Sequence, residues 1–148
     1  SRQRLPGQTS SGGIENSTAS LLSQARAINF SDPQKAIELY SEVLKLDPDN
    51  TEALTYRSWL IALIARDAAD DIKIVALAAA LQGLERAIEV DPNYPDAHCF
   101  LGIVRYRLAA DAAGAKEQLD ICAASNPPAE VMGFVSSIIE EVNAALPG

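Results

Sequence analysis

The sequence contains few of the residues that most metal sites and enzyme active sites require. Among its 148 residues are one histidine, His98, and two cysteines, Cys99 and Cys122. These three residues are too few for a closed structural zinc site, and no histidine remains to serve as a base elsewhere. We therefore expect no metal, no cofactor and no enzymatic activity.

Aromatic residues and positive charge are also scarce. Phe, Trp and Tyr make up 5% of the chain while alanine occupies 25 positions, so the apolar surface comes in small units that suit close contacts between helices. A β-sandwich would need more β-branched and aromatic residues. The 12 basic and 20 acidic residues give a net charge of −8, which disfavours contact with a phosphate backbone, and we expect no nucleic-acid partner.

The N-terminal segment differs in composition from the rest of the chain. Residues 1–16 are rich in Gly, Ser and Gln without apolar periodicity, which is typical of a flexible linker. We therefore expect a linker at 1–16 and one folded domain at 17–148. No stretch reaches the roughly 18 consecutive apolar residues that span a bilayer. Because the chain begins at Ser1 and not at Met, we interpret it as a fragment that a targeting or membrane segment precedes.

From Ser17 onward, apolar residues recur at intervals of three and four, the spacing of one face of a helix. Proline, with Asp, Ser or Asn beside it, separates the apolar runs, ending one helix and starting the next. The pattern predicts an all-α chain with no strand. Seven helices are expected, at about 17–30, 33–46, 51–66, 71–90, 95–109, 112–125 and 128–145.

Three of these helices carry one pattern at fixed spacing. The copies are Ala36, Tyr40, Val43 and Pro48; Ala80, Leu84, Ala87 and Pro92; and Ala115, Leu119, Cys122 and Pro127. The pattern resembles the second helix of the tetratricopeptide repeat (TPR), a helical hairpin of 34 residues that stacks into a superhelix. The resemblance implies an α–α superhelix of three hairpins, followed by a capping helix from Pro128.

The spacing of the prolines departs from a regular array. Pro48 and Pro92 are 44 residues apart, ten more than one repeat, so we expect an elongated middle hairpin with one to two extra turns in each helix. The alternative is a long disordered loop, but four apolar residues there favour buried helix: Ile72, Ile74, Val75 and Leu77. Ser58 and Gly102 stand where the two helices of a hairpin must approach closely.

In TPR superhelices the concave face is lined mainly by the first helix of each hairpin and characteristically receives a peptide. Carried over to this chain, the resemblance places nine residues on that groove: Leu21, Ala25, Ile28, Thr55, Trp59, Leu63, Cys99, Ile103 and Tyr106. No lysine lies there to form the clamp with which some TPR domains hold a C-terminal carboxylate. The implied ligand is an amphipathic helix or extended apolar segment, with basic residues attracted by the acidic domain.

Several interpretations of this groove stay open. Trp59 either anchors a ligand, as Trp does at many binding hot spots, or packs inside the long hairpin. The groove either receives a foreign peptide or is filled by the linker, by the capping helix or by a second copy of the chain. In the last case the domain would be a structural scaffold or a homodimer.

His98 and Cys99 do not form a catalytic pair, because neighbouring residues on a helix point about 100° apart. We expect a core or edge position for His98. Cys99 and Cys122 lie on the two helices of the third hairpin, where they either form a disulfide in an oxidising compartment or pack as two free thiols.

A second resemblance is to bacterial membrane-tethered TPR proteins identified as cytochrome c biogenesis factors, through residues 4–9, 46–60 and 94–98. In that group a basic cytoplasmic stub and one transmembrane helix precede a linker, and the repeats lie outside the membrane. The resemblance implies a chaperone that holds a helix of apocytochrome c and passes it to the haem-attachment machinery, at the extracytoplasmic face of a bacterial membrane. The chain itself has no Cys-x-x-Cys-His motif for haem.

Overall fold

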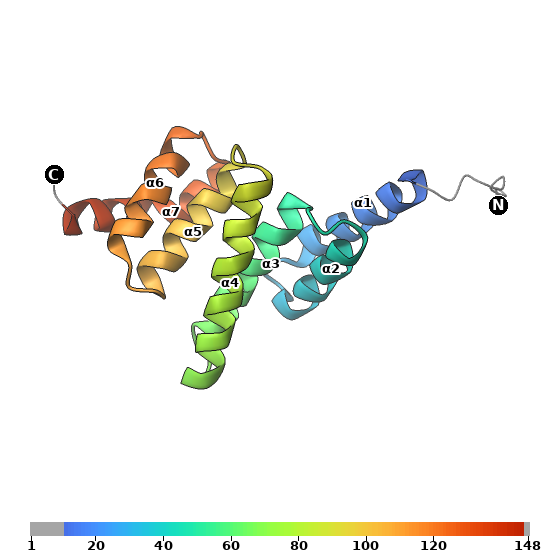
Figure 1. The fold of residues 1–148 in the computed structure, drawn as a ribbon, viewed down its shortest axis with the longest axis horizontal. Helices are drawn as coiled ribbons and strands as arrows, with labels where there is room; N and C mark the ends of the chain where they lie inside the picture. Colours follow the sequence, from blue (N-terminus) through green and yellow to red (C-terminus); the bar gives the residue numbers. More distant parts are fainter. Residues whose placement is uncertain (1–10, 147–148) are drawn as a thin grey trace.

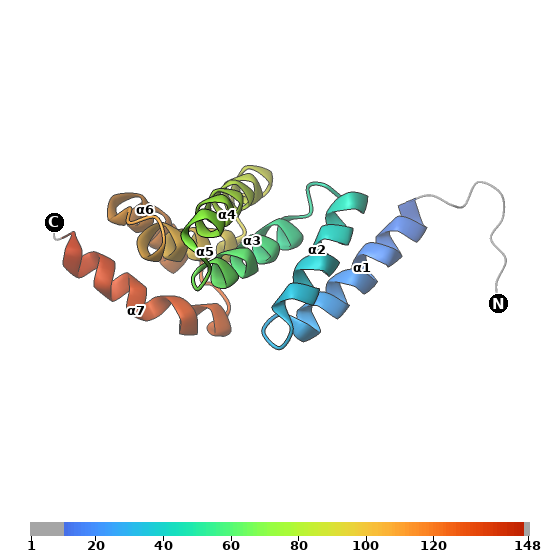
Figure 2. The same cartoon turned by 90° about the horizontal axis from the view of Figure 1, so that it is seen from below.

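The computed structural model describes residues 11–146, and this part of the chain is helical apart from its turns. Its helices are α1 (Ser11–Ile28), α2 (Pro33–Leu46), α3 (Thr51–Ala65), α4 (Asp70–Val90), α5 (Pro95–Arg107), α6 (Ala112–Ala124) and α7 (Ala129–Ala145). They form three hairpins, α1 with α2, α3 with α4 and α5 with α6, and α7 packs against α5 and α6. The hairpins lie side by side along the long axis of the molecule (Figures 1 and 2). The predicted superhelix of three hairpins and a capping helix is confirmed.

The predicted helix boundaries hold to within two residues for α2 to α7, and side-chain caps mark the starts of α2, α3 and α6. Asp32 accepts a hydrogen bond from the backbone N–H of Lys35, ahead of Pro33 in the first turn of α2. Asn50 caps α3 in the same way by accepting from Ala53. Side chains that accept from a free N–H of the first turn stabilise a helix start by about 1 kcal/mol.

The start of α1 differs from the prediction. The helix begins at Ser11, six residues before the expected start at Ser17. Among the side chains described there, residues 15–17 are exposed and Thr18 is the first that is buried, so residues 15–17 give apolar periodicity no buried face to detect. Residues 1–10 of the expected linker lie outside the described residues.

The repeated Asp-Pro signal builds the same turn twice. Asp47 and Asp91 have nearly equal backbone angles, with φ of −141° and −142° and ψ of 84° and 89°. In each turn a backbone N–H three residues further on, that of Asn50 or Tyr94, donates to the aspartate carbonyl. The sequence repeat is therefore a structural repeat, and it sets the angle between successive hairpins.

The alanines of the repeat lie at the close contacts between helices. Ala36, Ala80 and Ala115 are fully buried. A Cβ on Gly102 of α5 would lie 2.5 Å from Leu119 Cδ2 of α6, so only glycine permits this helix approach. Ser58 likewise lies against Gly83 across the α3–α4 contact. The expectation of small residues at the hairpin contacts is confirmed.

The middle hairpin is elongated, but not as expected. α4 has 21 residues against 13 in α6, while α3 has 15 against 13 in α5, so the extra length lies mainly in α4. Its first turns project beyond the neighbouring helices (Figure 1). The expected burial there is wrong for three residues: Ile72, Ile74 and Val75 are 59%, 69% and 70% exposed. α4 packs against α3 and α5, and these helices leave the outer face of its first turns uncovered.

A disulfide links the two helices of the third hairpin. Cys99 of α5 and Cys122 of α6 are bonded, with their Cα atoms 4.9 Å apart and both side chains fully buried. Of the two alternatives for this pair, the structure shows the bridge. No helix within residues 11–146 is long and apolar enough to cross a membrane.

Candidate functional site

Two neighbouring clefts open between the first helices of the hairpins and α7. We call the first the acidic cleft; its volume is about 430 Å³ and it lies between α1, α3, α5 and α7. Its walls are Arg26, Asn29, Phe30, Glu52, Tyr56, Tyr94, Asp96, Pro128, Glu130, Val131 and Phe134. We call the second the apolar cleft; its volume is about 300 Å³. Its walls are Trp59, Ala62, Leu63, Arg66, Ile103, Val104, Arg107, Leu108 and Ile138.

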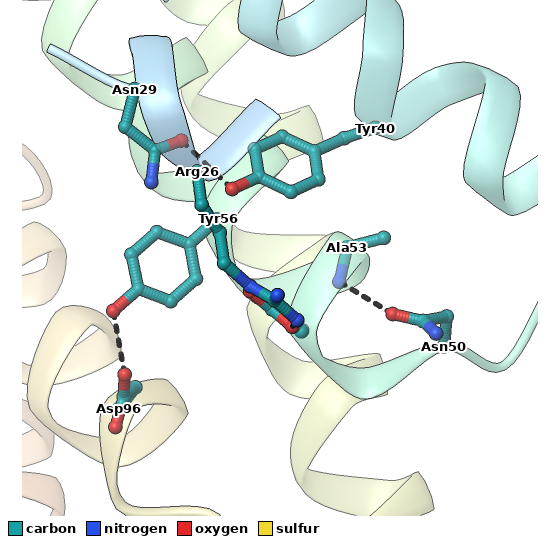
Figure 3. A network of polar contacts seen from close by, with 8 residues as sticks. Arg26, Asn29, Tyr40, Asn50, Ala53, Tyr56 and Asp96 are labelled. Carbon is teal, nitrogen blue, oxygen red and sulfur yellow. Dashed lines mark hydrogen bonds and ion pairs between the residues drawn. The ribbon is translucent and has the colours of Figure 1, made fainter. Parts of the chain in front are cut away.

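Polar contacts fix the side chains of the acidic cleft (Figure 3). The Arg26 guanidinium donates to both carboxylate oxygens of Glu52, at 2.6 and 2.7 Å, which joins α1 to α3. The Tyr56 hydroxyl donates to Oδ2 of Asp96 at 2.6 Å, which joins α3 to α5. These contacts hold one wall of the cleft rigid across three successive hairpins.

Burial and these partners shift the pKa values of the groups. Hydrogen bonding to Glu52 raises the pKa of Arg26. Burial, followed by the contact with the Asp96 carboxylate, raises the pKa of Tyr56. Burial also raises the pKa of Tyr94. Both phenols therefore stay protonated and neutral, so they serve this site as hydrogen-bond donors and aromatic surfaces and not as bases.

The apolar cleft is built around Trp59. Its indole stacks on Phe100, and Phe134 of α7 lies 6.4 Å from it, centroid to centroid. Phe134 lines the acidic cleft and Trp59 lines the apolar cleft, so the two clefts adjoin where these rings approach each other. Arg107 at the rim donates to Glu141 at 3.1 Å, so its charge is partly balanced. The indole N–H of Trp59 is buried without an acceptor among the described residues.

The nine residues predicted for the groove occupy several environments. Trp59, Leu63 and Ile103 line the apolar cleft together. Ala25, Thr55 and Cys99 are fully buried, so they offer no surface to a ligand in this conformation.

The three remaining groove residues lie outside both clefts. Leu21 faces a separate shallow hollow on α1, and Ile28 packs against the core of the first hairpin. Tyr106 packs at the edge of the larger core, beside the Arg107 guanidinium. The clefts therefore unite only Trp59, Leu63 and Ile103 of the nine.

Sequence reasoning missed the acidic cleft. The α3 face that lines the two clefts carries Glu52, Tyr56, Trp59, Leu63 and Arg66, in steps of three and four. The positions carried over from the TPR resemblance place Thr55 in the groove, whereas the structure buries Thr55 and lines the acidic cleft with Tyr56. The regular spacing of charged and aromatic residues was the signal that pointed to this face.

His98 has a structural position, as expected. Its side chain is 4% exposed, and Nε2 donates to the carbonyl of Pro92 at 2.8 Å in the α4–α5 turn. Nδ1 lies 2.6 Å from Oε1 of Gln118 on α6. The imidazole thus links the α4–α5 turn to α6. It lines neither cleft.

Comparison with known proteins agrees with this architecture. The family model described as TPR repeat matches residues 76–108, from within α4 to the end of α5. The crystal structure of the Sgt2 TPR domain from Aspergillus fumigatus superposes with a TM-score of 0.61 at 27% identity, covering 88% of this chain and 85% of that one. The chain has the fold of a TPR domain.

A second solved TPR structure superposes over most of its length. The first TPR of Spaghetti (RPAP3), bound to the HSP90 peptide SRMEEVD, has a TM-score of 0.67 at 16% identity, with 90% of this chain and 95% of that chain covered. Comparison with curated protein sequences finds no match. The shared feature of this chain and its structural neighbours is therefore the stacked-hairpin architecture.

Proposed function

We propose that this TPR domain is a non-enzymatic protein-interaction module whose apolar cleft binds an apolar, helical segment of a partner. The observation that carries the proposal is the open cleft between α3, α5 and α7, where Leu63 and Leu108 are only partly buried. Apolar side chains inserted there would add about 25 cal/mol of binding free energy per Å² that they bury. The bound peptide in the Spaghetti TPR structure supports a peptide ligand for this fold.

The position of α7 supports a ligand other than the capping helix itself. Val131 and Phe134 form a wall of the acidic cleft, and Ile138 forms a wall of the apolar cleft. The capping helix thus bounds both clefts and leaves them open. The two clefts therefore lie between α3 and α7, an arrangement that suits a single helix or extended chain.

We further propose that the segment is a helix of an apocytochrome c and that the domain works, tethered, at the extracytoplasmic face of a bacterial membrane. The resemblance to cytochrome c biogenesis factors supports this role. The Cys99–Cys122 disulfide supports the location, because such bonds persist in oxidising compartments. A peptide that copies a helix of an apocytochrome c should bind, and the folded holocytochrome should not.

The single tryptophan provides a direct test. Trp59 lines the apolar cleft, so a bound peptide should change its fluorescence emission, and a titration with an amphipathic helix of Leu and Lys should saturate. Replacement of half-buried Leu63 by Glu should weaken this binding at least about tenfold, since it places a charge in the cleft. Ile121→Glu on α6, outside both clefts, is the matched control. Equal affinities for the two variants would contradict the proposal.

A second candidate function is self-association through α4. The exposed Ile72, Ile74 and Val75 form an apolar surface on the projecting turns, and such surfaces often mark interaction sites. If α4 pairs with its copy, sedimentation at increasing concentration should show a dimer that Ile74→Lys abolishes. A monomer at all concentrations would remove this candidate and leave the peptide-binding proposal intact.

A further inference from the structure

The charges of the acidic cleft do not balance. Arg26 is the only cation of its wall, and its bidentate contact with Glu52 cancels both charges. Two carboxylates remain, Asp96 of α5 and Glu130 of α7, and neither has a cationic partner within 4 Å in the part of the chain that is described. The cleft therefore holds an uncompensated negative charge on two facing helices.

Asp96 is the more constrained of these two carboxylates. It is 5% exposed, and it accepts the Tyr56 hydroxyl at 2.6 Å. A neutral phenol offsets part of the cost of burying a carboxylate, and a cation offsets more. Asp96 lies in the first turn of α5, near the unpaired backbone N–H groups of the helix start. An unpaired negative charge is thus fixed at the wall of an open cleft.

Aromatic rings complete the walls of the acidic cleft. Tyr56 and Tyr94 lie beside Asp96, and Phe30 and Phe134 contact each other with centroids 5.7 Å apart. The two phenylalanines are 48% and 40% exposed. Aromatic faces attract cations and also pack against the aliphatic stem of a Lys or Arg side chain. Carboxylates and rings around one hollow therefore match an organic cation.

A metal ion fits the cleft less well. Within the described residues, no group of three or more His, Cys, Asp or Glu side chains converges on a point. A divalent cation prefers at least six oxygen ligands, whereas an ammonium or guanidinium needs a few acceptors and tolerates apolar walls. The aromatic walls therefore favour the organic cation.

We infer that the acidic cleft binds a Lys or Arg side chain of the same segment whose apolar residues occupy the apolar cleft. This inference rests on the proposed function, and it specifies the partner as a segment with a basic residue beside its apolar anchor. The clefts adjoin where Phe134 approaches Trp59, so one continuous segment spans both. The basic residue sets the register of the segment, because only the acidic cleft has carboxylates in its wall, whereas the charged residues of the apolar cleft are arginines.

The test uses two peptides that differ only in charge. The first is the amphipathic helix of Leu and Lys, and the second carries norleucine at the one Lys beside the apolar anchor, which keeps the aliphatic stem and removes that cation. We expect the second to bind about tenfold more weakly by calorimetry, and the affinity of the first to fall as salt rises.

Protein variants show which carboxylates bind the cation of the peptide. Glu130→Gln and Asp96→Asn should each reduce the affinity for the Lys peptide about three- to tenfold and leave that for the norleucine peptide unchanged. Asn at position 96 can still accept the Tyr56 hydroxyl, and circular dichroism checks that both variants fold. Glu140→Gln, which removes the same charge elsewhere on α7, is the control and should change neither affinity.

The outcomes separate this inference from the proposed function. Equal affinities for both peptides, with Leu63→Glu still disruptive, would overturn the cation site and keep the apolar one. A loss in Glu140→Gln equal to that in Glu130→Gln would assign the effect to net charge and also overturn the site. Failure of the unmodified domain to bind either peptide would overturn both proposals.

Discussion

The indole ring of Trp59 lies parallel to the phenyl ring of Phe100, with the centroids 4.5 Å apart and the planes 4° apart. Trp59 belongs to α3 and Phe100 to α5, so the stack joins two successive hairpins. Phe100 also meets the edge of Tyr56, which donates to Asp96. One aromatic cluster therefore supports the walls of both clefts, and fold stability and ligand binding depend on the same side chains.

We predict that Trp59→Ala destabilises the domain by about 3–5 kcal/mol, because it removes a large side chain that is 6% exposed. Urea unfolding followed by circular dichroism measures this change. Weaker peptide binding by this variant would partly reflect unfolding, so Trp59→Phe, which keeps a ring over Phe100, is the variant for binding measurements. A loss below about 1 kcal/mol for Trp59→Ala would contradict a supporting role for the stack.

Two glycine substitutions should change stability in opposite directions. In Gly102→Ala the new Cβ would lie 2.5 Å from Leu119 Cδ2, and the helices must separate at a cost of about 1–3 kcal/mol. Gly133 is an exposed position of α7, and in Gly133→Ala nothing lies within 4 Å of the new Cβ. Its higher helix propensity should stabilise the domain by about 0.5–1 kcal/mol. Thermal unfolding distinguishes these cases, and equal shifts would refute the argument from close approach.

Removal of the disulfide should cost about 2–4 kcal/mol, because the bond closes a loop between residues 23 positions apart. Thiol titration of the denatured, unreduced protein should detect no free thiol. The double variant Cys99→Ala, Cys122→Ala should have the stability of the reduced protein and should not respond to dithiothreitol. A response of that variant to the reductant would mean that the effect does not come from this bond.

The exposed turns of α4 should tolerate substitution. Ile74 is 69% exposed, so Ile74→Ser should change stability by about 0.5 kcal/mol or less. Leu84→Ala, further along the same helix at a fully buried position, should cost about 2–5 kcal/mol. Equilibrium unfolding of both variants tests whether α4 has an uncovered end. A cost above about 2 kcal/mol for Ile74→Ser would show that something packs on it.

The helices and their order could be predicted because their signals are local. Asp32 and Asn50 cap the helices that follow them, and the Asp-Pro turns at Asp47 and Asp91 are alike in sequence and in backbone angles. The small residue at Gly102 could be predicted for a similar reason, since the repeat fixes where two helices approach.

The sites depend on longer-range relationships, and sequence reasoning failed there. Ile74 looks like a core residue in the sequence, but no helix packed against α4 covers it, and it is 69% exposed. The pairing of Tyr56 with Asp96 spans 40 positions and two hairpins, and no local pattern contains it. Glu130 joins the cleft only because α7 turns back along α5.

Buried tyrosines should make the domain sensitive to alkali. Tyr40 is fully buried and donates to Oδ1 of Asn29 at 2.8 Å, as Figure 3 shows. Burial raises the pKa of Tyr40 to about 12, while a tyrosine in the unfolded chain has a pKa of about 10. The pKa values of Tyr56 and Tyr94 shift in the same direction, with burial again the main cause.

Because the folded state holds these protons more tightly, their contribution to stability is complete below about pH 10 and is lost as the pH rises toward 12. Urea midpoints measured from pH 8 to pH 12 should therefore fall steeply above pH 10. Absorbance at 295 nm should show the buried tyrosines ionising together with unfolding. Tyr40→Phe should be less stable at pH 8, since it leaves Asn29 without its donor, but should lose less stability between pH 10 and pH 12. Equal slopes for the variant and the unmodified domain would exclude Tyr40 as a source of the alkaline transition.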